Sequence, residues 1–317
     1  MTESHSNHFE LRNDGNLLRF IEDQTEELCL IAVRENGYAL QYVKNQTEEI
    51  CLEAVRENGW ALEFVENQTE EMCIIAVRKD GFVMTRVKNQ TREICLEAVR
   101  QRGTALSLVK DKTEEICLEA VRNTGLALEF VGDQTEEICL EAVKEDGYAL
   151  HYVKDKTDEI CLEAVRQNGY ALQYVKNQTE EICLEAVKEC GLVLKIVKDR
   201  SEKICLEAVK QDGKTLKYVN HRTDEIVLEA LMRDGKALKY IPNENQTREL
   251  CLIAVKQNGK ALRYVKEQTE EICLEAIEQN PNRSRYIIGS IRERKMQRRM
   301  REYIENRRFL KTKGAKR

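Results

Sequence analysis

The chain has 317 residues, of which 34% are charged and 6% aromatic, and its formal net charge is −5. With two prolines in the whole sequence, this composition is typical of a helix-rich soluble protein. Residues 1–10 are polar, and no apolar run approaches the roughly 18 residues that cross a bilayer. We therefore expect a cytoplasmic protein, with the nucleus as the alternative, that is neither secreted nor embedded in a membrane.

A 22-residue unit close to TEEICLEAVRENGYALEFVKNQ recurs through most of the chain. With the threonine as position 1, the twelve copies begin at Thr25, Thr47, Thr69, Thr91, Thr113, Thr135, Thr157, Thr179, Ser201, Thr223, Thr247 and Thr269. A fixed period in this range is typical of a stack of small identical units. Such a stack favours a binding surface over a globular core with a central pocket.

Positions 1 to 12 of each copy have the pattern of an amphipathic helix. Apolar residues occupy positions 4, 5, 6, 8 and 9, and polar ones occupy positions 2, 3, 7, 10, 11 and 12. Thr at position 1 suits the N-cap, and the acidic pair that usually follows suits the positive end of the helix dipole. We expect the glycine at position 13, such as Gly37, to end the helix in a left-handed conformation.

Positions 14 to 20 predict a second, shorter helix. Positions 15, 16 and 19 stay apolar from copy to copy, as in Ala127, Leu128 and Val131, with Thr215 as the one exception. A strand would instead keep alternate positions apolar. The sequence therefore predicts an all-α solenoid, a superhelical rod on the order of 100 Å long, made of hairpins of about eleven plus seven residues.

Three regions follow along the chain. Residues 1–24 hold a tail and a half-copy whose Leu17, Leu18, Phe20 and Ile21 are expected to cap the first repeat. Residues 25–280 form the twelve-repeat array, in which the two-residue insertion at 242–244 predicts a bulged loop. Residues 281–317 form a basic tail, expected to contain one helix that covers the last repeat.

The string CLEAVKEDGYALHYV at Cys139–Val153 resembles the helical repeat known as domain of unknown function 4116. That family is abundant in giant DNA viruses of amoebae, mimivirus and its relatives, and also occurs in some bacteria and protists. The resemblance covers roughly residues 11 to 280. It implies a viral source and action in the host cytoplasm or virion, and it brings no catalytic residues because the family has no established chemistry.

Eleven of the twelve cysteines occupy position 5, which suggests either a metal or disulfide ladder or a set of small core residues. Equivalent atoms of successive hairpins should lie about 9–10 Å apart, too far for a disulfide or a shared zinc ion. Val227 replaces the cysteine in one copy, which favours a buried apolar role. Cys190 lies outside this register and is expected to be exposed.

The four histidines form no cluster with Cys or Asp at ligand or triad spacing, and no phosphate-binding glycine loop occurs. Glu at position 7 and Arg or Lys at position 10 have the spacing of an ordinary surface ion pair within one helix. We therefore expect no enzyme activity, no catalytic, cofactor or metal site, and no small-molecule substrate.

Positions 14, 17, 18 and 21 would share one face of the second helix, and we name this face the second-segment stripe. It carries most of the tyrosines and the most variable positions of the repeat. A variable, aromatic-rich surface along a solenoid is the expected form of a protein-binding groove. The candidate partner-binding residues are Tyr38, Trp60, Tyr148, Tyr152, Tyr170 and Tyr174. The aromatic residues at position 18 could instead wedge between hairpins.

Positive charge is concentrated toward the C-terminus. Residues 281–317 hold fourteen Lys or Arg and three Glu, a net charge of +11. Position 17 has no base from Gln41 to Gln173, and bases follow at positions 14 and 17 of the later copies. These bases form a basic strip of Lys195, Lys214, Lys217, Lys236, Lys239, Lys260 and Arg263, which continues toward Arg298 and Arg299 in the tail. An acidic partner, nuclear import or nucleic acid could use this charge, and nucleic-acid association is the alternative function.

Overall fold

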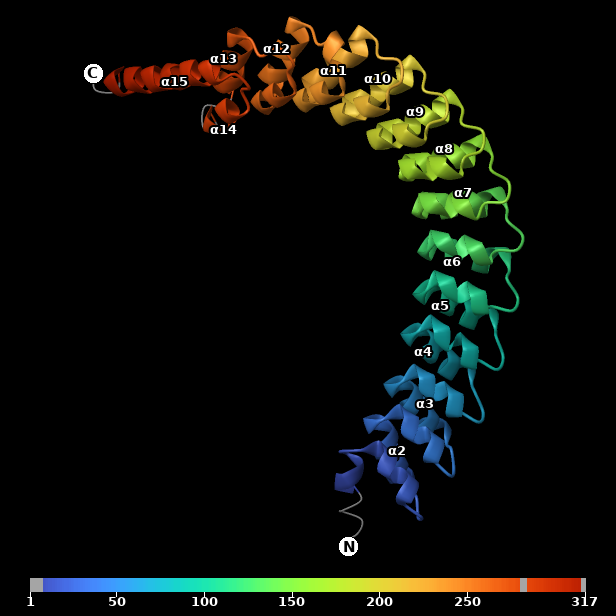
Figure 1. Cartoon of the computed structure of the whole chain (residues 1–317). Coiled ribbons are helices and arrows are strands. Elements are labelled where there is room, and N and C mark those ends of the chain that lie inside the picture. Colours follow the sequence, from blue (N-terminus) through green and yellow to red (C-terminus); the bar gives the residue numbers. More distant parts are fainter. Residues whose placement is uncertain (1–7, 280–283, 315–317) are drawn as a thin grey trace. The chain divides into compact units, whose positions relative to one another are not determined.

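The chain folds as an all-α repeat solenoid in the computed structural model, which describes residues 8–279 and 284–314. The described residues form α-helices and 3₁₀-helices (η) and no strand. The chain divides into two compact units, residues 1–167 and 168–317. Within each unit an α-helix lies beside a short helix, and successive pairs stack on one another (Figure 1).

The helices of the two units have nearly constant lengths. The first unit contains η1 (Gly15–Phe20), α2 (Glu26–Glu35), η2 (Gly37–Tyr42), α3 (Glu48–Glu57), η3 (Gly59–Phe64), α4 (Glu70–Lys79), η4 (Gly81–Arg86), α5 (Arg92–Gln101), η5 (Gly103–Leu108), α6 (Glu114–Asn123), η6 (Gly125–Phe130), α7 (Glu136–Glu145), η7 (Gly147–His151) and α8 (Asp158–Gln167). The second unit contains η8 (Gly169–Tyr174), α9 (Glu180–Glu189), η9 (Gly191–Ile196), α10 (Glu202–Gln211), η10 (Gly213–Tyr218), α11 (Asp224–Arg233), η11 (Gly235–Tyr240), η12 (Asn243–Asn245), α12 (Arg248–Gln257), η13 (Gly259–Tyr264), α13 (Glu270–Gln279), α14 (Ser284–Gly289) and α15 (Arg294–Gly314).

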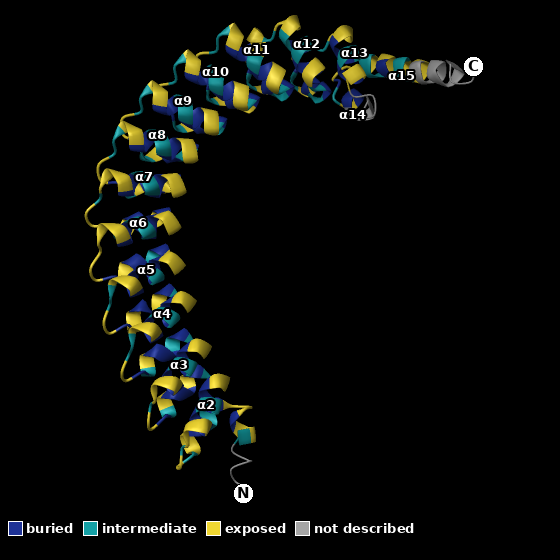
Figure 2. Cartoon of the chain, turned by 180° about the vertical axis from the view of Figure 1, so that it is seen from behind, coloured by how far each residue is buried: buried dark blue, intermediate teal, exposed yellow. Residues whose placement is uncertain are grey.

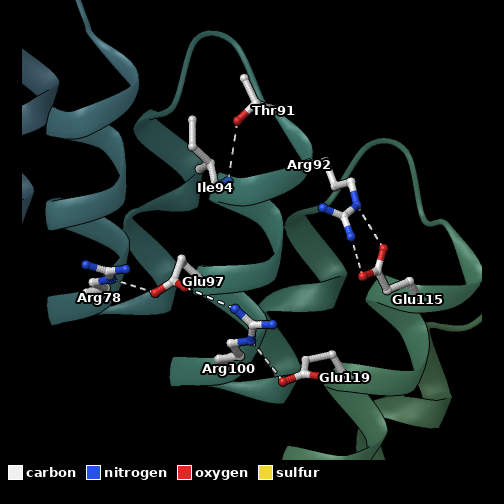
Figure 3. Close-up of polar contacts among 8 residues, drawn as sticks. All are labelled: Arg78, Thr91, Arg92, Ile94, Glu97, Arg100, Glu115 and Glu119. Carbon is white, nitrogen blue, oxygen red and sulfur yellow. Dashed lines mark hydrogen bonds and ion pairs between the residues drawn. The ribbon is translucent and has the colours of Figure 1, made fainter.

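The N-terminus of each long helix is built as predicted. In α2 the Thr25 hydroxyl accepts a hydrogen bond from the Leu28 N–H at 3.3 Å, and Glu26 and Glu27 occupy the first turn. The same cap recurs at Thr91, whose hydroxyl accepts from the Ile94 N–H (Figure 3). Because the cap satisfies an otherwise unpaired backbone donor, it fixes the start of the helix at position 2.

The helix does not end on a left-handed glycine, so that prediction is wrong. No described residue, glycine included, has a positive φ. The α-helix ends at position 12 instead, where Asn36 adopts an extended conformation with φ −148° and ψ 107°. The Asn36 side chain then accepts the Tyr38 N–H at 3.0 Å and caps the following short helix.

The glycine at position 13 is required by close packing between successive repeats. A Cβ added to Gly37 would lie 2.5 Å from the carbonyl oxygen of Ala54 in the next repeat. A Cβ on Gly125 would lie 2.4 Å from the Ala142 carbonyl oxygen. Both distances are well inside van der Waals contact, so only a hydrogen atom fits there.

The second segment is helical as predicted, but it is a 3₁₀-helix over positions 13 to 18. Three residues per turn place positions 14 and 17 above one another on the outer side. In the second repeat the inward residues Ala61, Leu62 and Val65 are at most 1% exposed. Thr215, the polar exception, is also buried, and its hydroxyl donates to the Asp212 carbonyl oxygen at 2.7 Å.

The core runs continuously through the stack, between the two helices of each repeat and between successive repeats. Positions 4, 5, 8 and 9 of the long helices are buried, except for the half-buried Leu250, and they pack on the short helices and on neighbouring long helices. Figure 2 shows the buried residues following the stack. A hairpin of ten plus six residues cannot exclude water by itself, so each repeat depends on its neighbours.

A glutamine at position 22 joins most repeats to the next, and Lys112, Lys156, Arg200 and Arg222 take its place at four junctions. The Gln46 side-chain amide donates to the Phe64 carbonyl oxygen at 2.8 Å and accepts the Glu66 N–H at 3.1 Å. The Cys51 thiol also donates to Gln46, at 3.5 Å. One side chain thus pairs three polar groups of the following repeat. Arg200 keeps only the donor half of this contact, with Nη1 2.8 Å from the Tyr218 carbonyl oxygen.

Charged side chains on the long helices form a ladder that crosses repeat boundaries. Glu97 accepts from Arg78 of the previous repeat at 2.5 Å and from Arg100 of its own helix at 3.2 Å (Figure 3). Arg100 then donates to Glu119 of the next repeat at 2.9 Å. The sequence predicted the pair within one helix, and the structure adds the pair between helices.

The insertion near Pro242 forms a loop between repeats, as predicted, with one 3₁₀ turn at η12. At the same repeat junction, apolar residues occupy both positions that form the charged ladder elsewhere. Met232 stands at position 10 and is 57% exposed, and Ile253 stands at position 7 of the following repeat.

The two ends differ in part from their predicted caps. At the N-terminus Leu11 and Leu18 are buried, whereas Phe20 is 68% exposed and carries Arg19 over its ring. At the C-terminus the tail forms two helices, α14 and α15, where one was expected.

The first of these two helices supplies the second segment of the last repeat. Ile287, Ile288 and Ile291 are buried, with the spacing of positions 15, 16 and 19. Gln268 accepts the Arg292 N–H at 2.8 Å. Gln46 accepts the Glu66 N–H in the same way, so Arg292 stands at position 20 of the last repeat. The last repeat is therefore completed by residues 284–292, after four extra residues.

Candidate functional site

The second-segment stripe is narrower than the sequence predicted. The short helix ends at position 18, so position 21 lies in the turn that follows, as Asn45 does after η2. The second-segment stripe therefore consists of positions 14, 17 and 18. Its backbone is set by the buried residues at positions 15, 16 and 19, so its side chains are free to vary without disturbing the core.

In the first unit the stripe is aromatic and close to neutral. Tyr38 at position 14 contacts Phe64 at position 18 of the next repeat, with ring centroids 6.0 Å apart in an edge arrangement. Trp60 donates from Nε1 to Asp80 at 3.3 Å, and the Arg86 guanidinium lies 6.0 Å from its ring. Position 14 of one repeat and position 18 of the next thus form one continuous surface.

The predicted aromatic residues differ in exposure. Tyr38 and Tyr148 are exposed, whereas Trp60 and Tyr170 are half-buried. Tyr152 and Tyr174 at position 18 are half-buried as well. Position 18 also supplies the carbonyl oxygen that the position-22 glutamine binds, as at Tyr152, where Gln134 donates at 3.0 Å. The side chains at position 18 are therefore partly packed between repeats and partly exposed.

Two further exposed residues at position 14 were not among the predicted contacts. Phe82 is exposed and lies under the guanidinium of Arg102, 4.7 Å from the ring centroid. Leu126 is exposed at the equivalent place in η6. Applying position 14 uniformly to every copy would have identified both.

In the second unit each base of the stripe at position 17 lies over a tyrosine ring. Lys217 and Lys239 lie 4.5 Å from the ring centroids of Tyr218 and Tyr240. A hydrogen bond to the tyrosine raises the pKa of each of these lysines, so both stay charged at neutral pH. The same pairing joins Lys195 with Tyr170 at 5.2 Å and Arg263 with Tyr264 at 5.4 Å.

The remaining lysines of the basic strip, at position 14, differ in exposure. Lys214 is exposed, whereas Lys236 and Lys260 are half-buried. The aspartates that precede Lys214 and Lys236 accept backbone N–H groups as caps, at 2.9 and 3.0 Å. Helices η9, η10, η11 and η13 contain seven basic residues and no acidic one, so this part of the stripe carries net positive charge.

The two predicted tail residues have different roles. Arg299 is paired with Glu270 of α13 at 2.9 Å, so it helps to hold α15 on the last repeat. Arg298 is exposed and lies 3.8 Å from Glu302 of its own helix. Met300 is buried beside them, which agrees with the predicted covering role of this segment.

The position-5 thiols lie in the core, as predicted. All eleven are free and buried, and burial raises the pKa of each. For Cys51, Cys183, Cys251 and Cys273 the pKa rises to about 11. A protonated thiol is a poor nucleophile and a poor metal ligand. Cys190 is only partly buried, at position 12 before η9.

Small hollows recur along the edge formed by the loops. One of about 450 Å³ lies between Gly132 and Ile160, and one of about 260 Å³ occupies the equivalent place between Glu66 and Ile94. Their polar groups are already paired: Lys154 donates from Nζ to the Gly132 carbonyl oxygen and from its backbone to Gln134. A third hollow lies at the equivalent place between Asn243 and Ile272, so these are repeated features of the stack.

A stack of near-identical helical hairpins, with a uniform core and variable outer positions, defines an α-solenoid repeat protein. The chain matches the family described as Domain of unknown function (DUF4116) in segments 25–68, 91–135, 113–156, 135–179, 157–201, 179–222, 201–246, 223–269 and 247–292. Because these segments cover well over half of the chain, the protein belongs to that family. The last match ends at residue 292, where the twelfth repeat is completed in the structure.

The search of curated proteins gives no match to the chain. Among the described residues, no helix combines the length and apolar character that a membrane crossing needs.

Proposed function

We propose that the protein is a non-enzymatic scaffold that binds a protein partner along the second-segment stripe. The observation that carries this proposal is the separation of core and surface within the short helix. Positions 15, 16 and 19 are buried in every described repeat, while position 14 ranges from Trp60 to Lys214. Variable aromatic side chains on a rigid repeated support are well suited to protein recognition.

Nucleic acid is the alternative partner, contacted by the basic strip and by α15. Proteins that bind single strands usually offer open aromatic faces on which bases stack. In the second unit, a cation of the chain itself lies over the rings of Tyr170, Tyr218, Tyr240 and Tyr264. A titration with RNA and duplex DNA at low salt tests this alternative, which predicts an affinity that falls as salt is raised.

The proposal keeps the place of action that the family resemblance implies, the host cytoplasm or the particle of a giant virus. Antibody detection of the protein in fractionated infected cells and purified particles would test it. Detection in the nucleus alone would argue for the nucleic-acid alternative instead.

Retention of partners on the immobilised protein tests the proposed surface. The variant Tyr148→Ala/Tyr152→Ala/Tyr170→Ala/Tyr174→Ala removes four aromatic residues of the stripe, and we expect it to lose proteins that the wild type retains. The control Leu228→Ala/Met232→Ala removes two exposed apolar side chains of α11 and should retain them. If the folded stripe variant and the wild type retain the same set, the stripe is not the binding surface.

A further inference from the structure

The basic half of the second-segment stripe places a cation beside a tyrosine ring four times, three times within one short helix and once, at Lys195, against Tyr170 of the preceding repeat. Lys195, Lys217, Lys239 and Arg263 are each exposed at position 17. Each lies within 5.4 Å of the centroid of a half-buried tyrosine ring. Helices η10, η11 and η13 thus each present a cation beside a ring of the same helix, and the cation of η9 lies beside a ring of η8.

These cations lack nearby acidic partners on the short helices themselves. The Asp212 and Asp234 carboxylates accept the backbone N–H groups of Lys214 and Lys236, and their charge contributes to the raised pKa of Lys217 and Lys239 without forming an ion pair with them. None of the four cations forms a salt bridge within the described part of the chain, and their contacts there are with tyrosine rings. The charge is therefore available to a ligand that carries negative groups.

The period of the stack limits the form of that ligand. Packed helices lie roughly 8–10 Å apart, so consecutive cations recur at about that distance. A polyproline II segment has three residues per turn and a rise of about 3.1 Å per residue, which places every third side chain on one face about 9 Å apart. In a β-strand, residues three apart point to opposite faces.

The tyrosine rings of the basic strip also suit a polyproline II ligand. Polyproline II segments dock on surfaces lined with aromatic side chains, and their preformed backbone loses little entropy on binding. Tyr170, Tyr218, Tyr240 and Tyr264 provide such rings next to the cations.

We propose that this half of the stripe binds an acidic peptide segment in the polyproline II conformation, with Asp or Glu at every third residue and one carboxylate for each repeat. The inference rests on the proposed protein-binding function of the stripe and names the class of partner. A periodic carboxylate meets each cation in turn, while the residues between carboxylates pack on the tyrosine rings.

Fluorescence anisotropy with labelled synthetic peptides tests the proposal on the full chain. The probe is a 15-residue peptide of five Glu-Pro-Pro triplets, and its isomer has five Glu followed by ten Pro. We expect the triplet peptide to bind about tenfold more tightly at low salt, because four exposed ion pairs form together only in the matched register. The binding should weaken as salt is raised.

Two variants that lose the same number of positive charges distinguish binding at the basic strip from non-specific electrostatic attraction. Lys195→Gln/Lys217→Gln/Lys239→Gln/Arg263→Gln should lose the tenfold preference. Lys176→Gln/Lys203→Gln/Lys210→Gln/Lys256→Gln removes four exposed lysines of the same unit outside the stripe and should keep it. Circular dichroism of each variant checks that the helices are intact.

Several outcomes would overturn the proposal. Equal affinity for the two isomers, equal loss in both variants, or absence of peptide binding would each do so. Tighter binding of a 15-nucleotide oligothymidylate than of the triplet peptide would assign the strip to nucleic acid. Failure here leaves the tyrosine-dependent retention of partners standing, so it is distinguishable from failure of the proposed function.

Discussion

The two units of the chain have the same core and different charged surfaces. In the first unit, position 10 is mostly arginine, and Arg34, Arg78, Arg100 and Arg122 each reach a glutamate of the next repeat. In the second unit, Lys210 and Lys256 stand at this position, and neither has an ion pair in the described part of the chain. The guanidinium donates in several directions and can bridge two helices, whereas an ammonium is a point donor on a flexible stem.

The short helices of the two units also differ in charge. Helices η2 to η7 contain Glu63 and Glu129 against one base, Arg86, whereas η9, η10, η11 and η13 contain seven bases and no acid. The charges of the stripe thus nearly balance in the first unit, whereas the second unit carries a net positive charge there. In a repeat protein, buried positions set the fold of every copy alike, while outer positions diverge because the core does not depend on them.

The largest expected effect concerns the end of the second unit. Deleting residues 281–317 removes Ile287, Ile288 and Ile291, each worth roughly 2 kcal/mol of burial. We expect the amides of α13 to lose protection in hydrogen exchange and the protein to lose solubility. Deleting only residues 293–317 leaves these isoleucines in place and should have a smaller effect.

An internal deletion in the first unit is the control for the truncation. Removing Thr135–Lys156 takes out one complete period and keeps each type of repeat junction, so the remaining helices should stay folded. If this deletion unfolds the chain while deletion of 281–317 leaves α13 protected, the nearest-neighbour stack is wrong.

Substitution of the position-13 glycine should affect both units equally, because the core is common to them. Gly125→Ala and Gly213→Ala each place a Cβ 2.4 Å from a carbonyl oxygen of the next repeat, Ala142 or Ala230. We expect a loss of about 1–3 kcal/mol, measured by hydrogen exchange in urea. Gly132→Ala, with nothing within 4 Å of the added Cβ, should be neutral or slightly stabilising. A loss at Gly132 equal to that at Gly125 would contradict the packing argument.

Acid should weaken the first unit more than the second. Hydrogen bonds from Arg34, Arg78 and Arg122 hold the pKa of Glu53, Glu97 and Glu141 below the usual value. A lowered pKa contributes stability above the unfolded pKa of about 4.3, and this contribution is lost as pH falls through the lower folded value. Protection factors of α4 to α6 should therefore fall between pH 6 and pH 3, by roughly 0.2–1 kcal/mol for each pair. Glu97→Gln should remove its share of this pH dependence, and an unchanged profile would show that the ladder contributes nothing.

The smallest effect is a gain in the second unit. Lys210→Arg should extend the ladder to the half-buried Glu229 of the next repeat and stabilise the junction by about 0.3–0.5 kcal/mol. A double-mutant cycle with Glu229→Gln measures the coupling, and Lys203→Arg serves as the matched exposed control. A gain that persists without Glu229 would mean that the new arginine acts elsewhere.

The amino-acid sequence by itself determined the period, the start of each long helix, the helical nature of the second segment and the burial of the position-5 thiols. These features depend on contacts within one copy, such as Thr25 with Leu28, or on the comparison of twelve copies in one chain. The Tyr38 and Tyr148 side chains could be placed on the surface for the same reason, since position 14 varies too freely to be core.

Only the tertiary structure decided the roles that depend on a neighbouring repeat. Gly37 faces a carbonyl oxygen 17 residues ahead, Gln46 binds groups 18 and 20 residues ahead, and Arg78 meets Glu97. The last repeat ends at residue 292 because α14 fills it after four extra residues, which the 22-residue spacing concealed. Propensity and periodicity act within a few residues of the chain, whereas these contacts depend on how closely two separately formed hairpins approach each other.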